Sequence, residues 1–165
     1  EKARKYHQLI GDTSRTMIDA INDIVWVVNP KNDSMESLIY RMRRFSSTLF
    51  EARNIRLHFK DDETLIQLQL PMNMRRNLYM IFKEIVNNAA KHSGATEVTI
   101  DLIRNGHQLI FRISDNGKGF ETGAKSSGNG LTNMQARALD INALLKITSS
   151  PDAGSTFEFS AQAIK

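Results

Sequence analysis

Four polar side chains recur along one face of the segment from Met74 to His92. Glu84, Asn88, Lys91 and His92 lie at positions i, i+4, i+7 and i+8, and a helix would place them in one stripe beside its apolar face. A stripe of carboxylate, amide, amine and imidazole is unusual for packing and is a candidate site. Surface helices also carry such residues by chance, so the stripe alone is weak evidence.

A second candidate is Asp115, which follows a segment whose apolar residues alternate over 109–113. A period of two places Asp115 on the same face as those core residues. An inward carboxylate without a partner is costly, so it is either paired within the protein or meets a donor on a ligand. Gly117 and Gly119 follow, and glycine lacks the side chain that would block a ligand. We therefore favour a ligand site.

A second glycine pair, Gly128 and Gly130, precedes a helix predicted over 131–139. Free N–H groups at a helix N-terminus favour anions such as phosphate. A lone Gly-x-Gly is weak evidence, but here it follows both the Asp115 loop and the polar stripe, a combination that packing does not readily explain. The P-loop sequence and the dinucleotide fingerprint are both absent, so those phosphate-binding loops are excluded.

Helices and strands alternate along the chain that must position these residues. Helical spacing predicts one helix that Asp33 or Ser34 caps and that ends near Arg53-Asn54, and two further helices over 74–92 and 131–139. Alternation predicts strands over 55–59, 98–102, 109–113, 144–148 and 156–160, with Asp61-Asp62 as the turn after the first and Asn105-Gly106 as a hairpin turn. We expect an α+β fold, a two-layer sandwich in which helices cover one face of a mixed or antiparallel sheet.

The first thirty residues follow a different pattern. From Ile10 to Val28, apolar residues recur at steps of three and four, with Ser14 as the exception, which predicts a long helix with a heptad seam. Pro30 disfavours helix at the residue before it. A chain of 165 residues holds one core and a helical extension, so we predict a dimerisation-type helix over 1–30 and one domain over 31–165. Trp26 is interpreted as packing at the end of the seam.

Composition excludes several classes of function. The chain has no cysteine, which excludes disulfides, thiolate metal sites and thiol catalysis. It has no run of about eighteen apolar residues, as a membrane span requires. The net charge of +4 could indicate nucleic acid, but no aromatic residues are interleaved with the arginine clusters at 41–44 and 75–76, so we expect a solvated helix face and no direct nucleic-acid binding.

Taken together, these motifs resemble those of two-component sensor histidine kinases. Residues 84–92, Glu-Ile-Val-Asn-Asn-Ala-Ala-Lys-His, are similar to the asparagine box, residues 115–120 to the first glycine box, residues 128–134 to the second, and residues 154–157 to the last strand. The resemblance implies the Bergerat fold, which histidine kinases share with gyrase, Hsp90 and MutL ATPases. Residues 23–33 resemble the end of the second dimerisation helix in the branch that pairs with NarL- or LuxR-type regulators.

The resemblance implies Mg-ATP as the ligand, with ATP and Mg²⁺ as cofactors. Asp115 would accept a hydrogen bond from the adenine amino group, supported by Thr156, and Asn88 would coordinate the magnesium. Glu84 would be the general base or a water-mediated magnesium partner. The remaining implied contacts are Lys91 and His92 at the phosphates, a lid over Glu121 to Asn129, and nucleotide contacts from Gly117, Gly119, Gly128, Gly130 and Leu131.

A phosphoacceptor is harder to place. A histidine kinase phosphorylates a histidine on the first helix of its dimerisation hairpin, and His7 lacks the acidic neighbour typical of that position. We therefore expect the acceptor outside this chain, so that the chain does not autophosphorylate alone. The resemblance also implies a receiver-domain response regulator as partner, a homodimer in the full-length protein, and a cytoplasmic location, with membrane attachment only through the missing N-terminal part.

The sequence leaves two alternative functions to consider. An ATP-hydrolysing clamp of the gyrase or Hsp90 kind would need a stronger catalytic acid and large partner domains, and the short predicted lid argues against it. A non-catalytic binding module with a vestigial pocket is disfavoured by the intact motifs.

Overall fold

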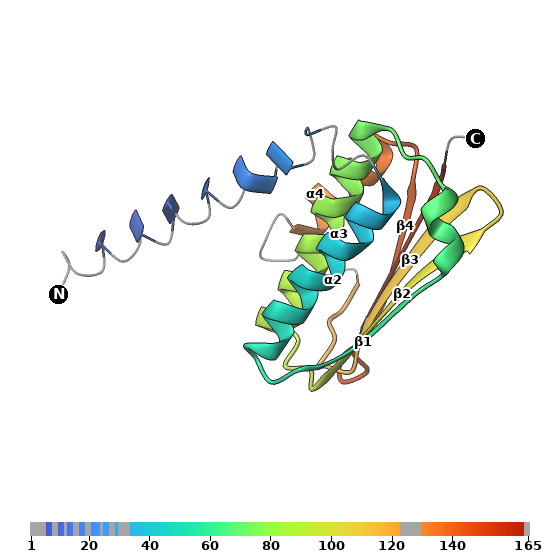
Figure 1. Cartoon of the computed structure of the whole chain (residues 1–165). Helices are drawn as coiled ribbons and strands as arrows, with labels where there is room; N and C mark the ends of the chain where they lie inside the picture. Colours follow the sequence, from blue (N-terminus) through green and yellow to red (C-terminus); the bar gives the residue numbers. More distant parts are fainter. Residues whose placement is uncertain are drawn as a thin grey trace.

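The computed structural model describes residues 34–122 and 130–163, together with residues 6, 7, 10, 11, 13, 14, 17, 18, 21–23, 25, 26 and 29. The part from residue 34 onward has two layers, with α-helices covering one face of a five-stranded sheet (Figure 1). Within the helical layer, α3 contacts both α2 and α4. This arrangement confirms the predicted α+β sandwich.

The sheet is mixed and has the strand order β1-β2-β3-β5-β4. β1 pairs in parallel with β2, whereas the other three pairings are antiparallel. The parallel pairing requires a crossover, and α3 supplies it between the two strands. The strands are β1 (Arg56–Asp61), β2 (Glu97–Asn105), β3 (Gln108–Asp115), β4 (Leu144–Ser149) and β5 (Ser155–Gln162).

Alternating burial of β2, β3 and β5 directs one row of side chains from each strand toward the helices. At the centre, the rings of Phe111 and Phe159 stack with centroids 4.8 Å apart. Phe82 from α3 meets the Phe111 ring edge-on at 6.4 Å. Such aromatic pairs contribute about 1 kcal/mol beyond the burial of their area. They fix α3, which carries the polar stripe, over the middle of the sheet.

The first helix of the domain, α2 (Met35–Glu51), begins where the sequence predicted. The Ser34 hydroxyl accepts a hydrogen bond from the Ser37 N–H at 3.1 Å and is the N-cap. The helix ends at Glu51, two residues before the predicted end, because residues 52–54 form a turn in which Asn54 has a positive φ of 54°.

A short 3₁₀-helix, η2 (Glu63–Gln67), follows β1 where only a turn at Asp61-Asp62 was predicted. The Asp62 carboxylate accepts hydrogen bonds from the Thr64 N–H at 2.9 Å and from the Thr64 hydroxyl at 2.7 Å. These bonds lower the pKa of Asp62, with the side-chain bond the larger cause. Five residues are too few to show a helical period, so η2 could not be predicted from the sequence.

The two remaining helices agree with the sequence, with small shifts. α3 (Met72–His92) begins directly after Pro71, two residues before the predicted start. α4 (Gly130–Leu139) begins one residue early. The β2–β3 hairpin is also present, but its two turn residues are Gly106 and His107, since Asn105 pairs with Gln108. Only Gly106 has a positive φ, at 64°, which fits a type II′ turn.

The N-terminal residues that are described lie in helical conformation up to Trp26 and project away from the two layers (Figure 1). Residues of the predicted heptad seam are exposed, among them Ile10, Met17 and Ile21. The seam residues Ile24 and Val28 lie outside the described residues. Among the described residues, no helix is both long and apolar enough to cross a membrane.

The end of this N-terminal segment packs on α2 and α3. Asp23 is 5% exposed and forms ion pairs with Arg41 at 2.8 Å and with Lys83. The Arg41 guanidinium lies 4.4 Å from the Trp26 ring centroid and 5.2 Å from that of Tyr79. Burial raises the pKa of the Tyr79 phenol. Trp26 is thus a packing residue, as the sequence predicted.

Candidate functional site

A cavity of about 860 Å³ opens between the helical layer and one end of the sheet. Its walls come from α3, from the end of β3 and the loop after it, from α4 and from strands β4 and β5. The residues that line it are Asn88, Ala89, His92, Ser93, Asp115, Lys118, Gly119, Phe120, Glu121, Thr122, Leu131, Thr132, Gln135, Ile147, Ser155 and Phe157.

The polar stripe of α3 meets this cavity through two of its four members. Asn88 and His92 line the cavity. Glu84 is half-buried one turn earlier, beside Gly130, where an added Cβ would overlap the Glu84 carboxylate. Gly130 therefore lets the start of α4 approach Glu84 and Asn88. Lys91 is exposed and does not contribute to the cavity wall.

Asp115 is the last residue of β3 and faces the cavity on the helix-covered side of the sheet. Its carboxylate accepts a hydrogen bond from the Gly117 N–H at 2.9 Å and another from the Ser155 hydroxyl. Both bonds hold the carboxylate in one orientation. The carboxylate thus has protein partners and still faces a space that can admit a ligand donor.

Thr156 does not support Asp115, contrary to the role that the resemblance implied. Its hydroxyl forms a hydrogen bond with Ser114 at 3.0 Å, and both residues lie on the sheet face away from the helices, because β5 alternates. The neighbouring residue Ser155 contacts Asp115 instead. A shift of one residue along a strand reverses the face. Ser155 is two residues before the buried Phe157 and therefore lies on the same face. This period of two is the sequence signal that identifies Ser155.

The glycines of the loop after β3 are needed for a reason other than ligand access. A Cβ on Gly117 would overlap the Ser93 carbonyl oxygen, and one on Gly119 would overlap the Ser150 carbonyl oxygen. Gly119 also has a positive φ of 60°. These glycines let the loop lie against backbone from α3 and from the β4–β5 turn. Gly128 lies outside the described residues.

The cavity also has an apolar wall, most of which was not predicted from the sequence. The rings of Phe120 and Phe157 lie 6.4 Å apart, and Ile147 and Leu131 line the same space. Leu131 alone was predicted. Ile147 and Phe157 alternate with less buried residues on β4 and β5, so their face could be predicted. Which of the inward residues border a cavity depends on the assembled fold.

The predicted lid over Glu121 to Asn129 is described only at its beginning. Glu121 and Thr122 line the cavity, and the other residues of the lid lie outside the described residues. A second hollow, of about 460 Å³, lies between α2 and β1 and is lined by Arg43, Ser47, Glu51, Ile55, Leu57 and Phe59. It contains none of the predicted site residues.

Comparison with known proteins agrees with this geometry. The family model "Histidine kinase-, DNA gyrase B-, and HSP90-like ATPase" matches residues 73–164. Sensor protein VraS of Staphylococcus saprophyticus is 41% identical over 96 residues, which cover 58% of this chain and 28% of VraS. The chain thus spans less than a third of the length of this relative.

Two solved structures show the same fold at low sequence identity. Acinetobacter baumannii histidine kinase AdeS superposes with a TM-score of 0.69 at 13% identity, covering 96% of this chain and 84% of AdeS. ShkA, solved in complex with AMPPNP, has a TM-score of 0.69 at 15% identity, covering 99% of this chain and 39% of ShkA. The family match includes α4 and four of the five strands, and with them every segment that lines the cavity, so this chain belongs to the histidine kinase-, DNA gyrase B- and HSP90-like ATPase family.

Proposed function

We propose that this chain is the Mg-ATP-binding catalytic region of a sensor histidine kinase. It donates the γ-phosphoryl group of ATP to a histidine for relay to a response regulator. The observation that carries this proposal is the convergence of Asn88 and His92 from α3 with Asp115 from β3 on one cavity. Similarity to VraS and to the AMPPNP-bound ShkA supports a kinase and a nucleoside triphosphate.

The adenine end of the nucleotide lies against Asp115 in this proposal. An exocyclic amino group is a donor, and the Asp115 carboxylate has lone pairs left after its bonds to Gly117 and Ser155. Phe120 and Phe157 provide an apolar surface next to it. A flat base suits such a wall with one polar acceptor at its end.

The phosphates lie toward α3 and the start of α4. Asn88 and His92 line this part, as do Leu131 and Thr132 at the start of α4, and the N-terminus of a helix favours anions such as phosphate. Glu84 lies beside Gly130, and Lys91 is exposed next to His92, outside the cavity wall. We assign Glu84 as general base or water-mediated metal partner, and Lys91 as a charge near the phosphates.

The residues present fit Mg²⁺ as a partner of the nucleotide. Among the described residues, no three His, Cys, Asp or Glu side chains converge into a metal cage. Magnesium is usually held by one or two protein oxygens together with phosphates and water, and the Asn88 amide oxygen is a donor of that kind. When bound, the ion would neutralise phosphate charge, while the chain orients the nucleotide.

Two variants test the nucleotide site. Asn88→Ala and Asp115→Ala should each abolish detectable binding of Mg-ATP in isothermal titration calorimetry, because one removes the proposed metal ligand and the other the base acceptor. Asp101→Ala, on the opposite face of the sheet, is the matched control and should bind normally. Millimolar or tighter binding by both site variants would refute the site.

Phosphoryl transfer needs a separate test in the longer protein. Incubation with radiolabelled ATP should produce an acid-labile, base-stable phosphate, as expected for phosphohistidine, which then passes to a receiver domain. Rapid ATP hydrolysis by this chain alone would instead favour an ATPase clamp. Dimerisation through the exposed seam, membrane attachment outside this chain, and pairing with a NarL- or LuxR-type regulator are parts of the same proposal.

A further inference from the structure

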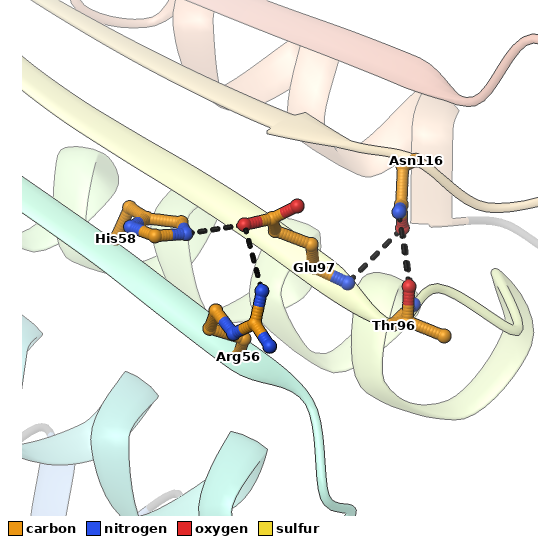
Figure 2. Close-up of polar contacts among 5 residues, drawn as sticks. All are labelled: Arg56, His58, Thr96, Glu97 and Asn116. Carbon is orange, nitrogen blue, oxygen red and sulfur yellow. Dashed lines mark hydrogen bonds and ion pairs between the residues drawn. The ribbon is translucent and has the colours of Figure 1, made fainter.

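Asn116 joins the loop of the candidate site to the start of β2 through both ends of its amide. Its Oδ1 accepts hydrogen bonds from the N–H groups of Thr96 and Glu97, both at 3.0 Å. Its Nδ2 donates to the Thr96 hydroxyl at 3.0 Å, as Figure 2 shows. The Asn116 N–H also donates to the Glu97 carbonyl at 3.3 Å. We call these four bonds the Asn116 clasp.

Asn116 lies in the sequence between Asp115 and Gly117, the residue whose N–H donates to the Asp115 carboxylate at 2.9 Å. The direction of the Gly117 N–H therefore depends on the path that Asn116 imposes on the chain. One residue later, the Lys118 N–H donates to the Ser93 carbonyl at 2.8 Å, and the loop is held on its other side.

Glu97 is itself held from the sheet edge. Its carboxylate forms an ion pair with Arg56 at 3.8 Å and a contact with His58, both on β1 (Figure 2). These side chains are exposed, so the pairs contribute little stability. The two contacts do hold the side chain of Glu97 in place, and the N–H and carbonyl of Glu97 are bonded to Asn116.

We propose that Asn116 is a positioning residue for base selectivity. Its clasp orients the Asp115 carboxylate so that a base with a 6-amino donor is preferred over one with a 6-oxo acceptor. This inference rests on the proposed function, in which Asp115 accepts from adenine. Asn116 itself is exposed and does not line the cavity, so it would act only through Asp115.

The test compares Mg-ATP with Mg-ITP in calorimetry on Asn116→Ala. Loss of an oriented, charged hydrogen bond should weaken ATP binding about tenfold. ITP, which offers no 6-amino donor, should change less than about twofold, so the ATP-to-ITP preference falls. Asn116→Asp keeps an acceptor oxygen for the two N–H groups and should restore most of the preference. An equal loss for both nucleotides would show a merely structural role and overturn the proposal.

Two further variants separate the possible failures. If Asp115→Ala keeps the full affinity for ATP, the proposed function fails at the base, whatever Asn116 does. If Asp115→Ala no longer binds ATP but Asn116→Ala keeps the wild-type ratio of ATP affinity to ITP affinity, only the positioning role of Asn116 fails. Should Asn116→Ala not fold, Thr96→Val decides, because it removes only the hydroxyl partner. A fall in the ATP-to-ITP preference that is smaller than the one predicted for Asn116→Ala supports the positioning role, and an unchanged preference overturns it.

Discussion

Ser155 and Thr156 are adjacent in the sequence but face opposite sides of the sheet. Ser155 donates to Asp115, and Thr156 pairs with Ser114 on the uncovered face. The motif resemblance located this pair but chose the wrong member. The strand alternation would have chosen correctly, since Ser155 is in phase with the buried Phe157 and Phe159.

This difference gives a prediction at the residue scale. Ser155→Ala should weaken Mg-ATP binding about fivefold to tenfold, because the Asp115 carboxylate loses one of its two orienting donors. Thr156→Ala is the matched control and should remain within about twofold of wild type. Calorimetry on both variants decides. A larger effect from Thr156 than from Ser155 would contradict this assignment.

The place of Asn88 and Asp115 on the cavity wall could be predicted because each lies on an element with a clear period. The role of the glycines could not be predicted in the same way. Gly117 and Gly119 contact backbone that is distant in sequence, at Ser93 and Ser150. Such close approaches appear only when the separate segments are assembled, so the sequence showed which residues were special but not the reason.

Gly119 and Gly106 provide a matched pair for stability. Both have positive φ, but a Cβ on Gly106 meets nothing within 4 Å, whereas one on Gly119 overlaps the Ser150 and Gly154 carbonyls. Gly106→Ala should cost about 1 kcal/mol from conformation alone, and Gly119→Ala about 1–3 kcal/mol more from overlap. Urea unfolding measures both. Equal costs would mean that the loop can move aside.

At the scale of elements, the sequence predicted every α-helix and every strand from residue 34 onward to within a few residues. It did not predict that β1 pairs in parallel with β2. The periodicity of a strand gives its two faces but not the direction of its neighbour, which here follows from the crossover through α3. The short helix η2 was missed for a related reason. It is held by local contacts such as those of Asp62 with Thr64 and is too short to show a helical period.

The packing of Asp23 and Trp26 on α2 and α3 is a contact between elements that can be measured directly. Trp26 is the single tryptophan of the chain, so its fluorescence reports on this junction alone. Asp23→Ala removes the shared partner of Arg41 and Lys83 and should loosen the segment by about 2 kcal/mol. We expect a red-shifted Trp26 emission and faster acrylamide quenching.

The control for this junction is Glu36→Ala, on the exposed side of α2, which should leave the emission unchanged. An Asp23→Ala protein with wild-type emission and quenching would show that Trp26 packs independently of the ion pairs. A double-mutant cycle with Lys83→Met would then measure whether the pair contributes at all.

At the scale of the molecule, the stack of Phe82, Phe111 and Phe159 joins the two layers. Phe111→Ala should lower the free energy of unfolding by about 3–5 kcal/mol, a large part of the stability of an ordinary domain. Phe120→Ala, on the half-buried cavity wall, should cost less stability but weaken nucleotide binding. Chemical unfolding should show the larger loss of stability for Phe111→Ala, and calorimetry on the folded proteins should show the larger loss of nucleotide affinity for Phe120→Ala.

The cavity wall is assembled from segments as far apart as Asn88 and Phe157. No partly folded form that lacks one of these segments presents the complete site, so a nucleotide binds the native state and not the unfolded chain. At a concentration one hundred times its dissociation constant, the nucleotide would add about 2.7 kcal/mol to stability. Cellular ATP would then protect this chain from proteolysis by lowering the unfolded fraction, in addition to the proposed role of ATP as phosphoryl donor.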